Sequence, residues 1–170
     1  MIPDRITKEE YYLGIAREVA RRSTCWRRSI GAIIVRDDQI VSTGYVGAPR
    51  KTRDSLEHGF CLRDRLGIPH GQRYELCRSV HAEQNAIINA ARAGVSLLGG
   101  DMYIHGTDAG TTTVINALPC YICKKMIINA GLVRVVCSSA AGPPAVFLID
   151  DWAKDWREGD ILDDTHQYGS

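Results

Sequence analysis

Two short motifs constrain this chain most, because they place metal-binding side chains at the starts of two helices far apart in the sequence. The first, His-Ala-Glu, occupies 81–83, and the second, Pro-Cys-x-x-Cys, occupies 119–123. Apolar spacing after each motif predicts helices over 81–94 and 119–131, the latter with its proline in the first turn. Because residues three apart share one side of a helix, both thiols of the second motif can reach one ion.

The cysteine pair alone leaves four interpretations open: a disulfide, a redox pair, half of a structural zinc site, or two ligands of a catalytic metal. The first ten residues, "MIPDRITKEE", contain no apolar segment, and no apolar run approaches membrane-spanning length. We therefore expect a cytoplasmic protein without a signal peptide or a transmembrane helix. Thiols stay reduced in that compartment, which favours metal ligands or catalytic residues over disulfides.

The His-Ala-Glu motif completes a zinc site. His81, Cys120 and Cys123 supply three ligands, which is the number found in catalytic sites that keep a fourth position for water. Helix N-termini favour thiolates, and zinc lowers the pKa of its water so that hydroxide forms near neutrality. Glu83 is positioned to move the proton of that water. A purely structural site would instead need a fourth protein ligand and would not need Glu83.

Hydrophobic periodicity predicts an α/β domain in which helices cover a mixed sheet. With 170 residues, the chain suits one domain over 1–170, with a core at about 8–140 and an acidic C-terminal helix and tail at about 145–170. The other expected elements are a helix over 8–22 capped by Thr7, strands over 31–36, 40–47, 101–106 and 132–139, loops over 48–80 and 107–118, and a short helix around 150–156.

Composition argues against two classes of partner. The net charge is +1 and aromatic residues make up 7% of the chain. Proteins that edit nucleic acids need a basic track and aromatic stacking platforms, and membrane-surface proteins need a comparable basic excess. We therefore expect a small-molecule substrate, with no membrane partner and no nucleic-acid partner.

Beyond the motifs, the chain resembles the deoxycytidylate (dCMP) deaminase family in its competence-protein-like branch. The similar segments are "STCWRRSIGAIIV", "STGYVGAP", "CLRDRLGIPHGQRYELCRSVHAEQNAI" and "PCYICKKMIINAGLVRVV". The resemblance implies a cytidine-deaminase-like three-layer α/β/α sandwich with a mixed sheet of about five strands. It also implies hydrolysis of dCMP to dUMP and ammonia, a homo-oligomer between dimer and hexamer, activation by dCTP and inhibition by dTTP.

Carried over position by position, the resemblance assigns His81, Cys120 and Cys123 as zinc ligands and Glu83 as the proton shuttle. It implies attack of zinc-bound hydroxide on C4 of the base, as the H-x-E…P-C-x-x-C signature of zinc deaminases describes. The residues expected to contact substrate are Ala82, through its backbone, Val46, Gly47, Pro119 and Arg27.

One departure from the family pattern bears on the substrate. The family's second strand usually ends in Gly-Tyr-Asn-Gly, whose Asn contacts the sugar, whereas Val46 occupies that position here. Valine cannot make that hydrogen bond, so substrate choice is relaxed or redirected. The alternatives are deamination of a nucleoside, a modified cytosine nucleotide, guanine or a riboflavin precursor. A nucleic-acid-editing enzyme and a non-catalytic binding module fit less well.

Three further features remain open. A substrate phosphate could be bound by basic residues near the first two strands: Arg27, Arg28, Arg50, Lys51 and Arg53. The stretch 107–117 could act as a lid by its position. Since some family members carry a second, structural zinc, Cys25, Cys61 and Cys77 with His58 or His70 could form one, the alternative being three buried or loop thiols. Cys137 is expected in the core.

Overall fold

The computed structural model describes residues 5–159. Its five strands form one sheet in the order β2-β1-β3-β4-β5. The strands are β1 Arg28–Arg36, β2 Gln39–Tyr45, β3 Asp101–Asp108, β4 Arg134–Cys137 and β5 Ala145–Leu148; the helices are α1 Lys8–Ala20, α2 Ser55–His58, α3 Leu62–Arg65, the 3-10 turn Tyr74–Leu76, α4 Ala82–Ala93, α5 Tyr121–Asn129 and α6 Ile149–Glu158.

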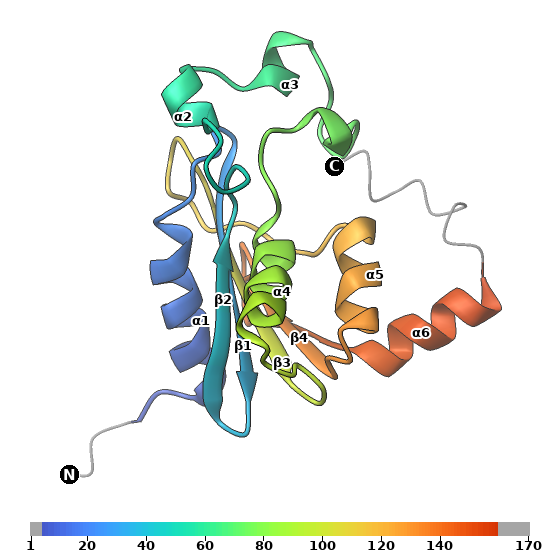
Figure 1. Ribbon diagram of the computed structural model, residues 1–170. Helices are drawn as coiled ribbons and strands as arrows, with labels where there is room; N and C mark the ends of the chain where they lie inside the picture. Colours follow the sequence, from blue (N-terminus) through green and yellow to red (C-terminus); the bar gives the residue numbers. More distant parts are fainter. Residues whose placement is uncertain (1–4, 160–170) are drawn as a thin grey trace.

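The expected three-layer α/β/α sandwich is confirmed. Helix α1 covers one face of the sheet, and α4 and α5 cover the other (Figure 1). Alternation along β1 explains this arrangement, because successive side chains of a strand point to opposite faces. Ile33 packs with Tyr103 under α1, whereas Ile34 packs with Ala86 and Ile127 under α4 and α5. No helix among residues 5–159 combines the length and apolar character needed to cross a membrane.

The sheet is mixed because a hairpin and two crossovers build it. β1 pairs antiparallel with β2 and with β3, whereas β3 and β4 run parallel. Asp37 and Asp38 form the hairpin turn with φ values of 52° and 62°, as a two-residue type I′ turn requires. The sequence did not predict β5, which has only four residues and leaves Val146 and Leu148 half exposed.

Several predicted boundaries need correction. The segment expected to be a loop over 48–80 contains α2, α3 and the 3-10 turn, each too short to give a clear apolar period. Helix α1 ends at Ala20 and not at residue 22. The helix around 150–156 is confirmed as α6, and the predicted acidic tail beyond residue 159 lies outside the described residues.

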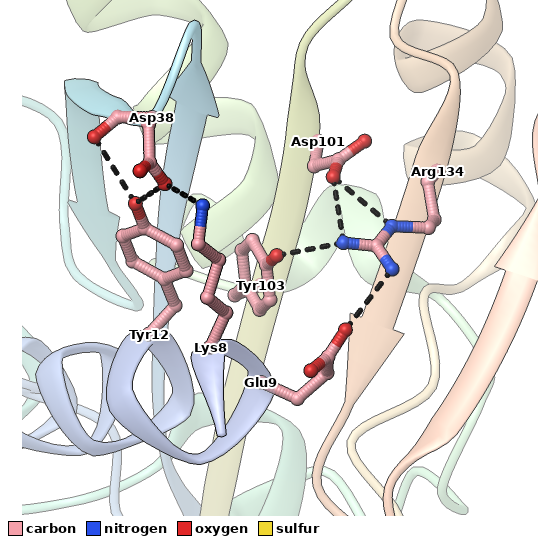
Figure 2. A network of polar contacts seen from close by, with 7 residues as sticks. All are labelled: Lys8, Glu9, Tyr12, Asp38, Asp101, Tyr103 and Arg134. Carbon is pink, nitrogen blue, oxygen red and sulfur yellow. Dashed lines mark hydrogen bonds and ion pairs between the residues drawn. The ribbon is translucent and has the colours of Figure 1, made fainter. Parts of the chain in front are cut away.

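Helix α1 is fixed at its N-terminus and to the hairpin. Thr7 accepts a hydrogen bond from the backbone of Glu10, whose side chain bonds back to Thr7, so the predicted cap is confirmed as a capping box. The Tyr12 hydroxyl donates to Asp38 at 2.7 Å, and Lys8 pairs with the same carboxylate at 2.8 Å (Figure 2). The hairpin turn is therefore attached to the helix.

A second polar network joins α1 to β3 and β4. Arg134 pairs with Asp101 at 2.8 Å and with Glu9 at 3.2 Å, and it donates to the Tyr103 hydroxyl at 2.8 Å (Figure 2). The guanidinium of this β4 residue thus contacts three acceptors on two other elements, β3 and α1. Because the network lies on the α1 face, it stabilises the layer opposite to α4 and α5.

Candidate zinc site

Helix α4 is bonded along the edge strand β2, which fixes where the helix begins. The Ser42 hydroxyl donates to the Ala86 carbonyl at 2.6 Å. The side-chain amides of Asn85 and Asn89, one turn apart, each donate to a β2 carbonyl at 2.8 Å. These bonds also cover edge carbonyls that would otherwise be open to another strand.

The N-termini of α4 and α5 bring the two sequence motifs together. His81 is the N-cap of α4 and Cys120 is the N-cap of α5, both with extended backbone. Glu83 and Cys123 lie in the first turns that follow. The sequence placed Pro119 in the first turn of α5, but the helix begins at Tyr121 and the proline precedes the cap. Both helices start at the end of the sheet where α2 and α3 lie (Figure 1).

The three predicted ligands are arranged around one point. The Nδ1 atom of His81 lies 3.5 Å from the Cys120 sulfur and 3.3 Å from the Cys123 sulfur. The ligand atoms all lie within 4.8 Å of one another, and residues 5–159 contain no other such group of three His, Cys, Asp or Glu side chains. Tetrahedral zinc with ordinary Zn–N and Zn–S bonds separates N and S by about 3.6 Å. The donor set therefore fits one Zn²⁺ with three protein ligands.

The titratable groups of this site perturb one another. A hydrogen bond with the Cys123 thiol, supported by His81, lowers the pKa of Cys120 to about 4 against the opposing effect of burial. The same bond and burial raise the pKa of Cys123. Burial opposes protonation of His81, but the bond to Cys120 and the charge of Glu83 raise its pKa on balance.

Glu83 is a buried carboxyl beside the ligands. Its side chain is 5% exposed, and burial raises its pKa despite the opposing charge of His81. Cys123 interacts with the carboxyl by a hydrogen bond. A carboxyl with a raised pKa is a stronger base than an exposed glutamate, which suits general acid–base catalysis.

A cavity of about 610 Å³ opens beside the zinc ligands. His81, Glu83 and Cys120 line one part of it, and Cys123 is fully buried behind them. The volume lies within the range of small-molecule sites, about 300–1,000 Å³. Four apolar residues also line the cavity: Ile30, Val46, Ile115 and Leu118.

Most residues expected to contact substrate lie on this cavity. Ala82, Val46, Pro119 and Arg27 line it. Gly47 does not; its backbone exchanges hydrogen bonds of 3.2 and 2.8 Å with Val80. The glycine therefore joins the chain just after β2 to the residue before His81 and does not line the cavity.

The structure selects among the basic residues proposed for phosphate. Arg27 and Arg28 line the cavity. Arg50 instead donates to Asn89 at 2.7 Å, and Arg53 donates to the Glu57 carbonyl at 3.0 Å. Neither these two residues nor Lys51 lines the cavity.

Sequence reasoning did not assign several cavity residues from the segment between β2 and α4 to the substrate site. Arg63, His70 and Tyr74 line the cavity. Their signal was their place in the segment over 61–87 that carries the family resemblance, next to the His-Ala-Glu motif. No periodicity marks them, because short turns and not a regular element bring them to the site.

The predicted lid also contributes to the cavity. Ile115 and Asn116 lie on its wall, and the Asn116 side chain accepts a hydrogen bond from the Ala140 backbone at 2.9 Å. The stretch is thus bonded to the loop after β4. Closure of a lid remains a prediction.

The second zinc is not supported by a ligand cluster. Cys25, Cys61 and Cys77 with His58 form no group of three ligand atoms within 4.8 Å in the described part of the chain. The thiols are neighbours, since Cys61 and Cys77 add to the effect of burial that raises the pKa of Cys25. The His58 ring packs on Phe60 at 5.9 Å. A second zinc stays a prediction, whereas the core position of Cys137 is confirmed.

An α/β/α sandwich with a His-Cys-Cys set and a buried glutamate at two facing helix starts defines a zinc-dependent deaminase. The protein family described as "Cytidine and deoxycytidylate deaminase zinc-binding region" matches residues 6–139 of this chain. The chain belongs to this family, and the resemblance noted in the sequence is confirmed.

Three relatives are similar over most of this chain. The deoxycytidylate deaminase of Mycobacterium phage D29 is 35% identical over 133 residues, covering 75% of this chain and 91% of that protein. The deoxycytidylate deaminase of Schizosaccharomyces pombe is 30% identical over 75% of this chain but only 36% of its own length. ComE operon protein 2 of Bacillus subtilis is 31% identical over 78% of this chain and 59% of that protein. This chain therefore spans only part of two of these relatives.

Solved structures agree on the fold. The dCMP deaminase of cyanophage S-TIM5, crystallised with dCMP and dUMP, is 26% identical with a TM-score of 0.53, covering 77% of this chain and 82% of that chain. The cytidine deaminase of Burkholderia pseudomallei is 18% identical with a TM-score of 0.56, over 86% of this chain and 95% of that chain, which shows a shared fold.

Proposed function

We propose that this protein hydrolyses the 4-amino group of a pyrimidine nucleotide, with dCMP as the main substrate and dUMP and ammonia as products. One observation carries the proposal: a single cavity is lined by His81, Glu83 and Cys120 of the candidate zinc site and also by arginines. The zinc-site residues suit hydrolytic deamination and the arginines suit a phosphate. Relatives named deoxycytidylate deaminase support this choice.

His81, Cys120 and Cys123 would hold Zn²⁺, which supplies Lewis acidity and lowers the pKa of water when bound. Glu83 would take one proton from the attacking water and deliver it to N3 of the base while the water oxygen bonds to C4. Glu83 would then carry the remaining proton of that oxygen to the amino nitrogen, so that the C4–N bond breaks, ammonia leaves and C4 keeps its oxygen as a carbonyl. No electron transfer is involved, so no redox cofactor is needed.

The surroundings of Glu83 support this role. Burial raises its pKa, so the carboxylate is a stronger base than it would be in water. The backbone of Ala82, in the first turn of the same helix, would contact the base. The apolar walls would hold the ring and exclude bulk water from the reacting atoms.

A second candidate substrate follows from Val46. This side chain is 7% exposed and lines the cavity with Ile30 and Ile115. A valine offers apolar contact and no hydrogen bond to the sugar, which makes a modified cytosine nucleotide, such as 5-methyl-dCMP, the second candidate. The homo-oligomer, the cytoplasmic location and regulation by dCTP and dTTP remain predictions from the family resemblance.

Ammonia release from a substrate panel tests the proposal. The panel contains dCMP, 5-methyl-dCMP, CMP, dCTP, deoxycytidine, cytidine and guanine. We expect dCMP or 5-methyl-dCMP to be turned over fastest. Absence of ammonia from every pyrimidine with zinc-loaded protein would refute the proposal.

Three variants test the assignment of roles. Glu83→Gln should keep its zinc and lose at least about 100-fold in turnover, since general acid–base catalysis contributes about 10²–10⁴-fold. His81→Ala should lose zinc as well. The matched control is Glu18→Gln, an exposed α1 residue paired with Arg21, which should retain activity. Full activity of Glu83→Gln would overturn the mechanism.

A further inference from the structure

Buried donors without partners mark the basic end of the cavity. Five buried side-chain nitrogen or oxygen atoms in the described residues lack a hydrogen-bond partner. Two of them are the Nε atom of Arg63 and the Nη1 atom of Arg27, and both residues line the cavity. A buried cationic donor without an acceptor is costly, so such atoms point to a ligand that supplies acceptors.

Arg63 is the most deeply placed of these cations. It is only 5% exposed although it is charged, and its Nη2 atom donates to the Pro69 carbonyl at 2.9 Å. That bond fixes the guanidinium but provides no counter-charge. An arginine is rarely buried without a partner, so its position is explained best by an anion that binds in the cavity.

Arg27 differs from Arg63 because it is paired with the Asp64 carboxylate, but it also keeps one donor without a partner. Its Nε atom donates to Asp64 at 2.6 Å and its Nη2 atom donates to the Ile68 carbonyl at 3.0 Å. The Nη1 atom is buried and has no hydrogen-bond partner. Arg28 and His70 also line the cavity. Burial lowers the pKa of His70, and the three arginines lower it further, as expected where positive charges gather. Among residues 5–159, Glu83 is the only carboxylate on the cavity lining.

Tyr74 connects the basic end to the zinc end. The Arg63 guanidinium carbon lies 4.9 Å from the centre of the Tyr74 ring. The same ring meets His81 edge to face, with centroids 4.9 Å apart and an angle of 86°. Arg63, Tyr74 and the zinc ligand therefore form one continuous row of contacts. The Tyr74 ring thus contacts both the Arg63 guanidinium and the His81 ring.

We propose that Arg63, with Arg27, binds the phosphate of the substrate, and that Tyr74 is a positioning residue that couples this binding to His81. The inference rests on the proposed function and names the part of the substrate that these residues select. Phosphate oxygens would satisfy the unpartnered nitrogens and hold Arg63 on Tyr74. A nucleotide would then differ from a nucleoside in turnover as well as in affinity.

Variants of Arg63 test the phosphate part. Arg63→Met should lower kcat/KM for dCMP by about 10- to 100-fold, as charge-assisted hydrogen bonds imply, and change deoxycytidine turnover little. Arg63→Lys should fall between. Arg65→Met is the matched control, because this exposed cation on the same short helix packs on Phe60 outside the cavity. Calorimetry with inorganic phosphate should show binding to the wild type and the Arg65 variant and at least tenfold weaker binding to Arg63→Met.

Variants of Tyr74 test the coupling. Tyr74→Phe keeps the ring and should retain wild-type turnover of dCMP. Tyr74→Leu removes the ring and should lower kcat for dCMP about tenfold or more, with a smaller change in KM and in phosphate affinity. If Tyr74→Leu changes KM alone, or lowers dCMP and deoxycytidine turnover by the same factor, the coupling is refuted.

The outcomes separate this inference from the proposed function. If the zinc-loaded wild type deaminates no pyrimidine, the proposed function fails. If it deaminates dCMP and deoxycytidine equally, or if Arg63→Met loses both substrates in the same ratio while folded and zinc-loaded, the reaction survives and the phosphate assignment fails. Should Arg63→Met not fold, Arg27→Met is used in its place, with the same expected loss of dCMP preference and the same refuting results.

Discussion

Replacing Gly44 by alanine tests how closely β2 must approach the helix that carries His81 and Glu83. A Cβ atom at Gly44 would lie 2.3 Å from the Ala86 backbone nitrogen and 2.4 Å from the Ala82 carbonyl oxygen. Both atoms belong to the α4 backbone and cannot rotate away.

The size of the effect follows from these distances. Ordinary contacts begin at 3.4 Å, so strand and helix must separate by 3.4 − 2.3 = 1.1 Å. Overpacking of this kind costs about 1–3 kcal/mol. A displacement of about 1 Å at a catalytic group can cost about 100-fold in rate. We therefore expect Gly44→Ala to lower the free energy of unfolding by about 2 kcal/mol and turnover by about 100-fold.

Two glycines of α1 and its face provide controls. Gly14 has open space around its Cβ position, so Gly14→Ala should stabilise the helix by up to about 1 kcal/mol and leave activity unchanged. At Gly31 a Cβ would lie 2.3 Å from the Ala16 carbonyl of α1. Gly31→Ala should therefore lose similar stability but keep most of its activity per folded molecule, because α1 lies on the face opposite to the zinc site.

Urea unfolding, zinc content and ammonia release measured on the same preparations provide the assay. The expected pattern is that stability falls in both strand variants and that turnover falls steeply only in Gly44→Ala. Wild-type turnover in folded Gly44→Ala, or equal loss of turnover in both strand variants, would show that the α4 contact does not position the site.

Three further predictions concern stability and the metal. Burial, with the charge of Arg17, lowers the pKa of His105, so the unfolded chain binds a proton below about pH 6.5 that the folded chain does not. Stability should thus fall from pH 7 to 5.5 more steeply in the wild type than in His105→Gln, and equal slopes in urea titrations would contradict this. Arg134→Met removes the partly buried pair with Asp101 and should lower the free energy of unfolding in urea by about 1–3 kcal/mol. Arg21→Met removes a surface pair and should lower it by less than about 0.5 kcal/mol. Equal losses of stability in the two variants would refute the reasoning. Chelation should lower both turnover and melting temperature, and Zn²⁺ but not Mg²⁺ should restore both, since a metal that binds the folded state stabilises it.

Local sequence was informative where metal-binding residue types occur at a predicted helix start. His81, Cys120 and Cys123 could be identified from residue type and spacing, and the structure brings them together. Helix ends marked by residues that favour a cap, such as Thr7, were also predictable. Strand β5 was not, because four residues give too little pattern to distinguish a strand from a loop.

The basic end of the cavity was the part that sequence could not assign. Five cations near the first strands were equally eligible, and two of them proved to line the cavity. Arg63 and Tyr74 lie in a segment without periodicity, and their approach to His81 depends on where short turns leave the chain. Only the packed structure reveals that Arg63 is buried and that one of its donors lacks a partner.

The sequence by itself determined the zinc-binding chemistry, because the His-Ala-Glu and Pro-Cys-x-x-Cys motifs place three zinc-binding side chains and one glutamate at the starts of two helices. It also determined the α/β class, because apolar periods of strands and helices alternate along the chain. The tertiary structure decided which end of the cavity is basic and how closely β2 meets α4. Those features depend on contacts between residues distant in sequence, such as Gly44 with Ala86, and no local pattern encodes such distances.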